Sequence, residues 1–241
     1  MGCILKLPER LMAAVNFIEQ GAYVADIGTD HGYLPVYLAL HGSARGIIAS
    51  DISEGSLKTA RQSAAKYGVA EKITFISAAG LDGIEKTDAD TVVVTGLGGE
   101  TIASILGDSP WIKRRNARLI LQPQSKIGEL CDFLRTNGYR ALDARLAYDN
   151  GRFYVILLVV YGKTESEPDR KSEPEPEIEI LSLLMHKRDP MFTSFLDTLI
   201  AKKRRVLENI EKANVPTPDN IRHKLAEYIE LKEEYKNDYC K

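Results

Sequence analysis

The chain is poor in the residues that mark disulfide-rich and zinc-binding proteins. Its 241 residues include three cysteines. Cys3, Cys131 and Cys240 stand far apart and none belongs to a CxxC pair, so neither a disulfide framework nor a zinc site is expected. We therefore predict a protein without a metal ion that works in a reducing cytoplasm.

Long apolar segments are also missing. The longest apolar or aromatic run, residues 153–161, is much too short to span a bilayer. The first residues lack the basic-then-apolar pattern of a secretory signal. With 44% hydrophobic and 27% charged residues, the composition is typical of a soluble globular protein with no membrane partner.

The chain as a whole has little excess of either charge, but two of its segments do. The net charge is −2, and basic and acidic side chains balance over residues 1–162. Residues 163–179 are acidic, whereas residues 186–205 are basic. Such a local basic segment matters more for polyanion binding than the total charge does.

What the chain does have, through residue 160, is an alternation of short apolar runs and helical patterns. Buried strands rich in Val and Ile are predicted at 22–27, 46–50, 72–76, 91–95 and 118–122. Helices are predicted at 7–20, 33–41, 53–67, 99–106 and 126–137, with Ser53 and Ser125 as N-caps. This rhythm predicts an α/β fold with a parallel sheet covered on both faces.

The last strands break the rhythm. The β-rich runs 139–148 and 152–161 are joined by Asp149-Asn150-Gly151, and an Asn-Gly turn between such runs predicts a hairpin. Five parallel strands followed by an antiparallel hairpin are expected for the Rossmann-like fold of class I methyltransferases that use S-adenosylmethionine (SAM).

Composition divides the chain into three parts. Residues 1–162 form the predicted SAM-binding methyltransferase domain. Residues 163–177 carry Glu, Ser, Lys and Pro but no aliphatic or aromatic side chain, which predicts a solvated linker. Residues 178–241 show three- and four-residue apolar steps broken at Pro216-Thr217-Pro218, which predicts a C-terminal, coiled-coil-like helical hairpin.

The candidate cofactor loop is residues 26–33, Asp-Ile-Gly-Thr-Asp-His-Gly-Tyr, at the end of the first strand. Gly28 and Gly32 permit unusual backbone angles and a close ligand approach. The nicotinamide fingerprint is not met, because Asp30 stands at its second glycine and would repel a pyrophosphate. Acidic side chains at Asp26 and Asp30 instead suit the ammonium and sulfonium groups of SAM.

Other candidate cofactor-binding residues follow the later strands. Asp51 ends the second strand at the distance expected for an acid that binds ribose hydroxyls, a feature shared by SAM and NAD sites. The remaining predicted cofactor residues are Thr29 in the loop, Ile52, the adenine-wall residues Gly80 and Leu81, and Gly96, Leu97 and Gly98 after the fourth strand.

Together these segments resemble the TrmK family, bacterial tRNA methyltransferases that modify N1 of adenine 22. The matching pieces are residues 26–35, 96–99 and 119–123, and the stretch 11–21 and the helical hairpin preceded by 189–192 look similar too. Residues 162–177 match least. The chain departs from the family at Ala79, where an Asp is common, although Asp82 could compensate.

The resemblance implies transfer of the SAM methyl group to N1 of adenine 22 in tRNA. N1 carries a lone pair and no proton, so no general base is required, and positioning and electrostatics should dominate. Asp30 is the expected stabiliser of the cationic product ring, and Tyr33 would stack on or orient the base. His31 is as consistent with a structural role as with a catalytic one.

Nucleic-acid binding is expected from basic clusters in a monomeric protein. Phosphate contacts of this kind provide affinity but little sequence information. The predicted tRNA contacts are Arg114, Arg115, Lys202, Lys203, Arg204 and Arg205.

Three other functions remain open at this stage. They are methylation of a small molecule or another RNA, non-catalytic binding of SAM or nucleic acid, and NAD-dependent oxidoreduction, the last disfavoured by Asp30 and Tyr33.

Overall fold

A seven-stranded sheet organises the first part of the chain. The computed structural model describes residues 5–162, 175–213, 216 and 218–239. The chain divides into two compact units, Met1–Glu177 and Ile178–Lys241. The strand order in the first unit is β3-β2-β1-β4-β5-β7-β6. The strands are β1 Ala22–Ile27, β2 Ala44–Asp51, β3 Thr74–Ser77, β4 Thr91–Leu97, β5 Arg118–Pro123, β6 Tyr139–Asp149 and β7 Arg152–Tyr161.

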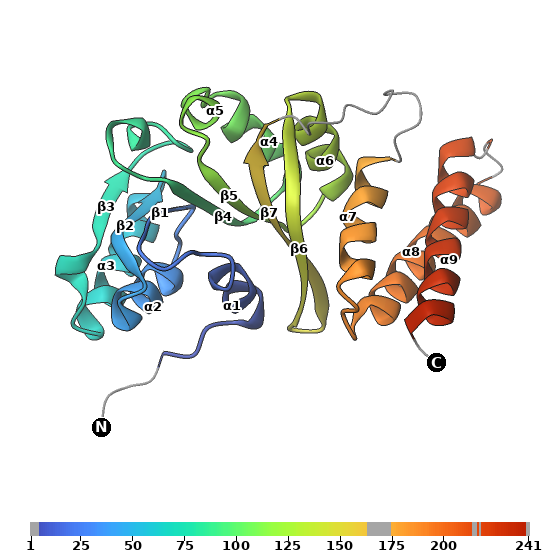
Figure 1. Ribbon diagram of the computed structural model, residues 1–241, viewed down its shortest axis with the longest axis horizontal. Helices are drawn as coiled ribbons and strands as arrows, with labels where there is room; N and C mark the ends of the chain where they lie inside the picture. The colour runs from blue at the N-terminus through green and yellow to red at the C-terminus, as the bar shows by residue number, and fades with distance from the viewer. Residues whose placement is uncertain (1–4, 163–174, 214–215, 217, 240–241) are drawn as a thin grey trace. The chain divides into compact units, whose positions relative to one another are not determined.

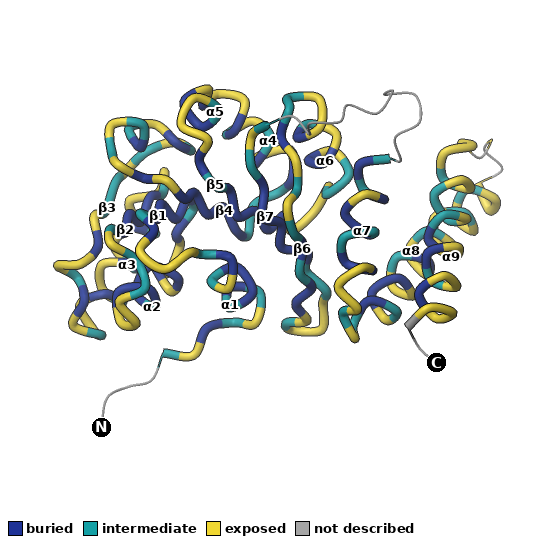
Figure 2. Tube along the Cα trace, viewed as in Figure 1, coloured by how far each residue is buried: buried dark blue, intermediate teal, exposed yellow. Residues whose placement is uncertain are grey.

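Strands β1 to β5 run parallel, and β7 returns antiparallel to β5. The central strands are mainly apolar because helices cover both faces, and Figure 2 shows them as the dark, buried part of the first unit. Val92, Val93 and Val94 of β4 are fully buried. The Rossmann-like class I fold predicted from the alternation is confirmed.

Two layers of helices cover the sheet, one on each face. Helices α2 and α3 pack together on one face and α4 and α6 on the other (Figure 1). Helix α1 lies against β5, β6 and β7. The helices are α1 Glu9–Val15, α2 Tyr33–His41, α3 Glu54–Lys66, α4 Gly99–Gly107, α5 Trp111–Arg115 and α6 Ile127–Thr136, with 3-10 turns η1 Ala70–Lys72 and η2 Ile84–Lys86.

Helix ends show where local sequence rules hold and where packing overrides them. Ser53 caps α3, since its Oγ accepts the Ser56 N–H at 3.3 Å. The predicted cap at Ser125 is wrong, because Lys126, with φ of 54°, occupies the position before α6. The Ser125 carbonyl instead accepts the Gly99 N–H at 2.9 Å and joins the two loops that follow β4 and β5.

The first helix is shorter than the expected 7–20 and ends at Val15. After it, Phe17 and Ile18 donate to carbonyls three residues back, so the chain leaves the α-helical path before reaching β1. Helix α5 was not predicted, and its single short turn of Trp-Ile-Lys-Arg-Arg gives no clear periodicity.

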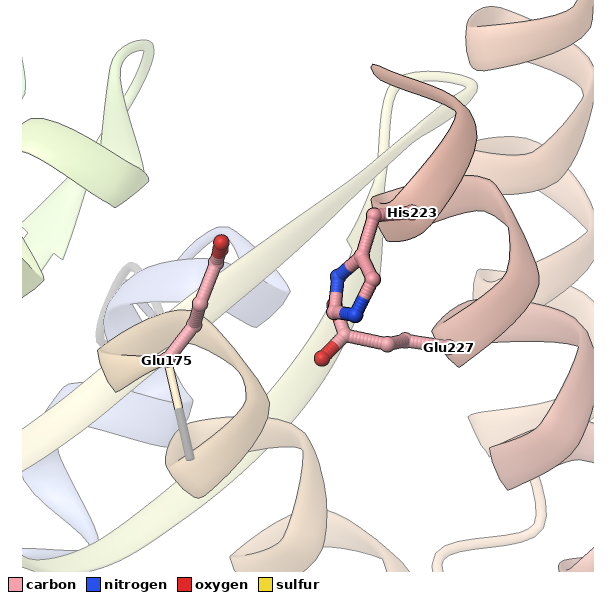
Figure 3. A group of neighbouring side chains, drawn as sticks. All are labelled: Glu175, His223 and Glu227. Carbon is pink, nitrogen blue, oxygen red and sulfur yellow. The ribbon is translucent and has the colours of Figure 1, made fainter. Parts of the chain in front are cut away.

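The second unit contains α8 Phe192–Lys212, α9 Asp219–Tyr239 and most of α7 Pro176–His186, whose first two residues belong to the first unit. Helices α8 and α9 are antiparallel: the Phe192 and Tyr235 rings are 5.0 Å apart, and the Tyr235 hydroxyl donates to the Asp189 carbonyl at 2.9 Å. On α9, His223 and Glu227 lie one turn apart with Nδ1 and Oε2 separated by 3.5 Å (Figure 3).

The predicted helical hairpin is therefore present as α8 and α9, and α7 is an additional helix before it. The predicted linker, 163–177, falls mostly outside the described residues, and α7 already begins at Pro176. Within the described segments, no helix is both long and apolar enough to cross a membrane.

Gly99 is expected to tolerate no side chain. A Cβ at this position would lie 2.1 Å from the Lys126 carbonyl oxygen, which is backbone and cannot move away without shifting the loop. We predict that Gly99→Ala lowers the free energy of unfolding by about 3 kcal/mol or more, as measured by urea denaturation. The control Gly55→Ala meets only the Ser53 Oγ at 3.5 Å in a helix and should be neutral or slightly stabilising. Equal stability of the two variants would contradict this.

Candidate functional site

A cavity of about 370 Å³ opens at the carboxyl ends of the central parallel strands. This volume lies in the range of small-molecule sites, and the place is the one where α/β sheets usually bind ligands. Its walls come from α1, from the ends of β1, β2 and β4, from the loops after β1 and β5, and from the starts of α2 and α3. The lining residues are Pro8, Arg10, Leu11, Asp26, Gly28, Thr29, Asp30, His31, Tyr33, Leu34, Asp51, Ser56, Thr95, Gly96, Leu97 and Gln124.

The loop between β1 and α2 turns through left-handed backbone conformations. Gly28, Asp30 and Gly32 have φ values of 74°, 45° and 68°. Gly28 and Thr29 donate their N–H groups to the Ser50 carbonyl of β2 at 2.8 and 3.0 Å. At Gly32 a Cβ would lie 2.8 Å from the Ala60 Cβ of α3, so the glycine is required both for the turn and for packing.

The Asp51 carboxylate joins the first loop to the second. One oxygen accepts the Ser53 N–H at 2.8 Å, and the other accepts the Asp30 N–H at 3.3 Å. Each carboxylate oxygen has a second lone pair, so Asp51 still offers acceptor sites to a ligand in the cavity.

Asp26 is a buried acid at the cavity wall. It is 4% exposed. Burial raises the pKa of Asp26 to about 7, and the nearby Asp51 carboxylate contributes in the same direction. A cationic ligand group placed against Asp26 would relieve both effects, so the site is electrostatically suited to a cation.

The rim of the cavity carries an acid and two rings. The Asp30 Oδ2 and the His31 Nε2 are 3.4 Å apart, and both side chains are more than half exposed. The His31 and Tyr33 rings stack with centroids 5.3 Å apart and planes 23° apart. Tyr33 is 40% exposed and therefore offers ring surface to a further planar group.

The opposite wall is formed by the ends of β4 and β5. Gly96 has φ of 83°, and the Leu97 side chain packs 3.7 Å from the position of a Gly28 Cβ. The Gln124 N–H donates to the Leu97 carbonyl at 2.8 Å. Arg10 reaches into this wall from α1, with its Nη1 donating to the Gln122 Oε1 at 3.4 Å.

The structure brings most of the predicted cofactor residues into this one cavity. Those that line it are Asp26, Gly28, Thr29, Asp30, Asp51, Gly96 and Leu97, and the predicted catalytic residue Tyr33 lines it as well. The others lie outside the lining: Gly32 packs on α3, Leu81 is buried in the core, Gly80 faces Ile105, Gly98 precedes α4, and Ile52 is 74% exposed beside Asp51.

Sequence reasoning missed the contribution of α1. Pro8, Arg10 and Leu11 line the cavity, but they precede β1 and belong to no loop at a strand end. Ser56, Thr95 and Gln124 were also missed. A weak signal existed for Gln124, which directly follows the Gln-Pro pair that ends β5.

The two basic clusters have different surroundings. Helix α5 leads into β5 and so lies at the amino edge of the sheet, opposite the cavity. There Arg115 donates to the Glu85 and Thr87 carbonyls, while Arg114 is exposed. On α8, Lys202, Arg204 and Arg205 are exposed and Lys203 is half-buried, and no ion pair found among the described residues includes these four.

Asp26 should make the stability of the ligand-free protein depend on pH. Its folded pKa is raised, so its contribution is present below about pH 4 and is lost as the pH rises to about 7. We predict that the stability of Asp26→Asn relative to wild type increases by about 3 kcal/mol between pH 4.5 and pH 8, at about 1.4 kcal/mol per pH unit up to about pH 7. Urea denaturation at both pH values measures this difference.

The exposed acid Asp88 provides the control, and Asp88→Asn should show no such pH-dependent gain. A difference between Asp26→Asn and wild type that stays constant from pH 4.5 to pH 8 would mean that Asp26 is ionised normally in the folded protein.

Comparison with known proteins identifies the family. The family model described as "Methyltransferase domain" matches residues 7–157. The chain is 34% identical to the tRNA (adenine(22)-N(1))-methyltransferase of Bacillus subtilis over 165 residues, which cover 68% of this chain and 69% of that relative.

Two solved structures extend the similarity over nearly the whole chain. The B. subtilis M1A22 tRNA methyltransferase TrmK superposes with a TM-score of 0.73 and 28% identity, covering 97% of this chain and 99% of that one. A Streptococcus pneumoniae putative tRNA (m1A22) methyltransferase in complex with S-adenosyl-L-methionine gives 0.79 and 27%, covering 94% and 100%. The chain therefore belongs to the TrmK family of SAM-dependent tRNA (adenine(22)-N(1))-methyltransferases.

Proposed function

We propose that this protein transfers the methyl group of SAM to N1 of adenine 22 in tRNA. The observation that carries the proposal is the acid-lined cavity at the carboxyl ends of β1, β2 and β4 in a chain of this family. Methylation of a small molecule by the same cavity is the alternative, and the mostly exposed basic residues of α8 favour tRNA over it.

The cavity residues fit SAM in charge and in hydrogen-bonding capacity. The buried Asp26 suits the ammonium group, because a cation there offsets the cost of burying the carboxylate. Asp51 is held in place by the Ser53 and Asp30 amides, with lone pairs left for ribose hydroxyls. We assign Ile52, Gly80 and Leu81 to the adenine side of the site, as the resemblance to the family implies.

When bound, SAM supplies an electrophilic methyl group, and transfer forms the N1–CH3 bond as the S–CH3 bond breaks, leaving a cationic adenine ring and S-adenosylhomocysteine. N1 has no proton to lose, so the protein needs no general base. Its contribution is to hold the base in line and to stabilise the positive charge that develops on the ring.

We assign these two tasks to Asp30 and Tyr33. The Asp30 carboxylate stands at the cavity rim, where it would stabilise the cationic ring or accept from the N6 amine. The Tyr33 ring, already stacked on His31, offers a surface for the base. Adenine 22 must leave its stack in the folded tRNA to reach them. We assign His31 to orienting Asp30 and Tyr33.

The C-terminal unit is proposed to bind tRNA through Lys202, Lys203, Arg204 and Arg205. Exposed cations on one helix neutralise phosphates and release counterions, which supplies affinity without sequence reading. Arg114 and Arg115 form a second candidate site for tRNA binding. It is the weaker candidate because Arg115 already donates hydrogen bonds to two backbone carbonyls. The domain division at 1–162, 163–177 and 178–241 assigns chemistry to the first part and tRNA binding to the last.

We further propose that the protein acts as a monomer, because one chain supplies both the cavity and a basic helix. We also propose that it works in the cytoplasm, which a tRNA substrate supports.

The proposed reaction is tested with labelled SAM and unmodified tRNA transcripts. We expect methylation of a wild-type transcript, mapped to N1 of adenine 22, and none of a transcript with guanine at position 22. Asp30→Asn should bind S-adenosylhomocysteine normally but lower kcat by about 100-fold, since it removes one charge that stabilises the transition state. Methylation of a metabolite pool in place of tRNA, or binding of NADH, would contradict the proposal.

The role of α8 is tested by neutralising two exposed cations. We expect Lys202→Gln combined with Arg205→Gln to raise the KM for tRNA at least about 10-fold at moderate salt and to flatten its salt dependence, because each phosphate contact contributes to the slope. The Kd for S-adenosylhomocysteine should not change. The control pair Lys86→Gln and Arg140→Gln removes the same charge from exposed sites at the amino edge. Equal effects of both pairs would rule out a specific role for α8.

A further inference from the structure

Arg10 stands out among the residues that line the cavity. The lining contains three carboxylates, Asp26, Asp30 and Asp51, and Arg10 is its one permanent cation among the described residues. Arg10 comes from α1, ahead of the loops that the cofactor assignment uses. A guanidinium at a mostly acidic site calls for an anionic partner on the ligand, in addition to the cations that the acids would bind.

The Arg10 side chain is held from three sides. Its Nη1 donates to the fully buried Gln122 Oε1 at 3.4 Å. Its Nε lies 3.8 Å from the Asp149 Oδ2, and the two side chains are 25% and 15% exposed. The guanidinium carbon is 6.0 Å from the centre of the Tyr154 ring.

The sheet topology explains how Asp149 reaches this place. Because β7 is antiparallel to β5, with Leu121 opposite Leu157, the start of β7 lies beside the carboxyl end of β5. The turn between β6 and β7, where Asp149 pairs with Arg152, is therefore carried to the same edge as the cavity. The hairpin thus supplies a carboxylate that orients Arg10 from outside the cofactor loops.

The contacts of Arg10 leave donors available. A guanidinium has five N–H groups, and the described contacts engage Nε and Nη1 but not Nη2. Nη1 lies near Gly96 as well, 3.9 Å from the position of a Cβ there. The free donors can therefore face a ligand lying along the ends of β4 and β5.

We propose that Arg10 binds the carboxylate of the methionyl part of SAM, and that Asp149 is the positioning residue that holds Arg10 for this contact. The inference rests on the proposed use of SAM. Charge matching supports it: the acids suit the ammonium and the sulfonium, and the carboxylate is the one anion of the cofactor. A phosphate of the RNA backbone is the less suitable partner, because the Arg10 side chain is three-quarters buried and faces the cavity.

The experiment measures binding of two ligands by calorimetry, with no catalysis involved. The ligands are S-adenosylhomocysteine and its decarboxylated analogue, which lacks only the carboxylate. We expect the wild-type protein to prefer S-adenosylhomocysteine by about 10- to 100-fold, the usual effect of a charge-assisted hydrogen-bond pair. Arg10→Gln should lose this preference, binding S-adenosylhomocysteine 10- to 100-fold more weakly and the analogue with nearly unchanged Kd.

Two further variants separate contact from positioning. Arg10→Lys keeps the charge but not the planar fork, so it should restore part of the preference. Asp149→Asn should weaken S-adenosylhomocysteine binding by about 3- to 10-fold and leave the analogue unaffected. Arg152→Gln, exposed in the same hairpin, is the control and should change neither Kd.

Several outcomes would overturn the proposal. The first is an equal affinity of the wild-type protein for S-adenosylhomocysteine and its decarboxylated analogue. This measurement needs no variant, so it still tests the proposal if Arg10→Gln fails to fold. If Arg10→Gln lost affinity for both ligands to the same extent, the role of Arg10 would be structural. A raised KM for tRNA with unchanged binding of S-adenosylhomocysteine would assign Arg10 to an RNA phosphate. If the wild-type protein bound neither ligand, the proposed cofactor itself would be wrong.

Discussion

The Asp51 carboxylate is the contact on which the geometry of the site depends. Two strand–helix loops that follow different strands are fixed to each other through its two oxygens, one on the Ser53 amide and one on the Asp30 amide. Asp30 has a left-handed backbone, which a side chain ordinarily disfavours, and the bond from its N–H to Asp51 helps to hold that conformation. The same acid that would bind ribose therefore also sets the position of the residue proposed to face the substrate base.

The electrostatics of the cavity follow from this arrangement. Burial raises the free-energy cost of ionising Asp26. The Asp51 carboxylate on the neighbouring parallel strand adds to this cost by charge repulsion. A ligand with separated positive groups removes that cost, whereas a pyrophosphate would increase it. The preference for a sulfonium cofactor over a dinucleotide thus follows from the negative charge of the cavity wall. It does not depend on any single hydrogen bond to the ligand.

Much of this could be predicted from the sequence, and the remainder could not for identifiable reasons. Local patterns were enough for four buried strands and, through the Asn150-Gly151 turn, for the hairpin. The third predicted strand, 72–76, is present as β3 Thr74–Ser77 at the sheet edge, but it is not buried as expected, because only one neighbouring strand covers it. The cap at Ser125 failed because its carbonyl is used by Gly99, a contact between distant loops that no local rule contains. Arg10 was missed for the same reason: its place in the cavity is created by Gln122 and Asp149, both more than a hundred residues away.

The left-handed backbone at Asp30 has a consequence for which side chains this position can accept. Glycine and asparagine would suit a φ of 45° as well as aspartate does, and most other residues would not. The proposed task at the rim, however, requires a negative charge, which glycine and asparagine lack. Conformation and charge therefore narrow the choice independently, and aspartate is the one residue type that satisfies both. Asparagine separates the two requirements, since it keeps the shape of the loop and removes only the charge.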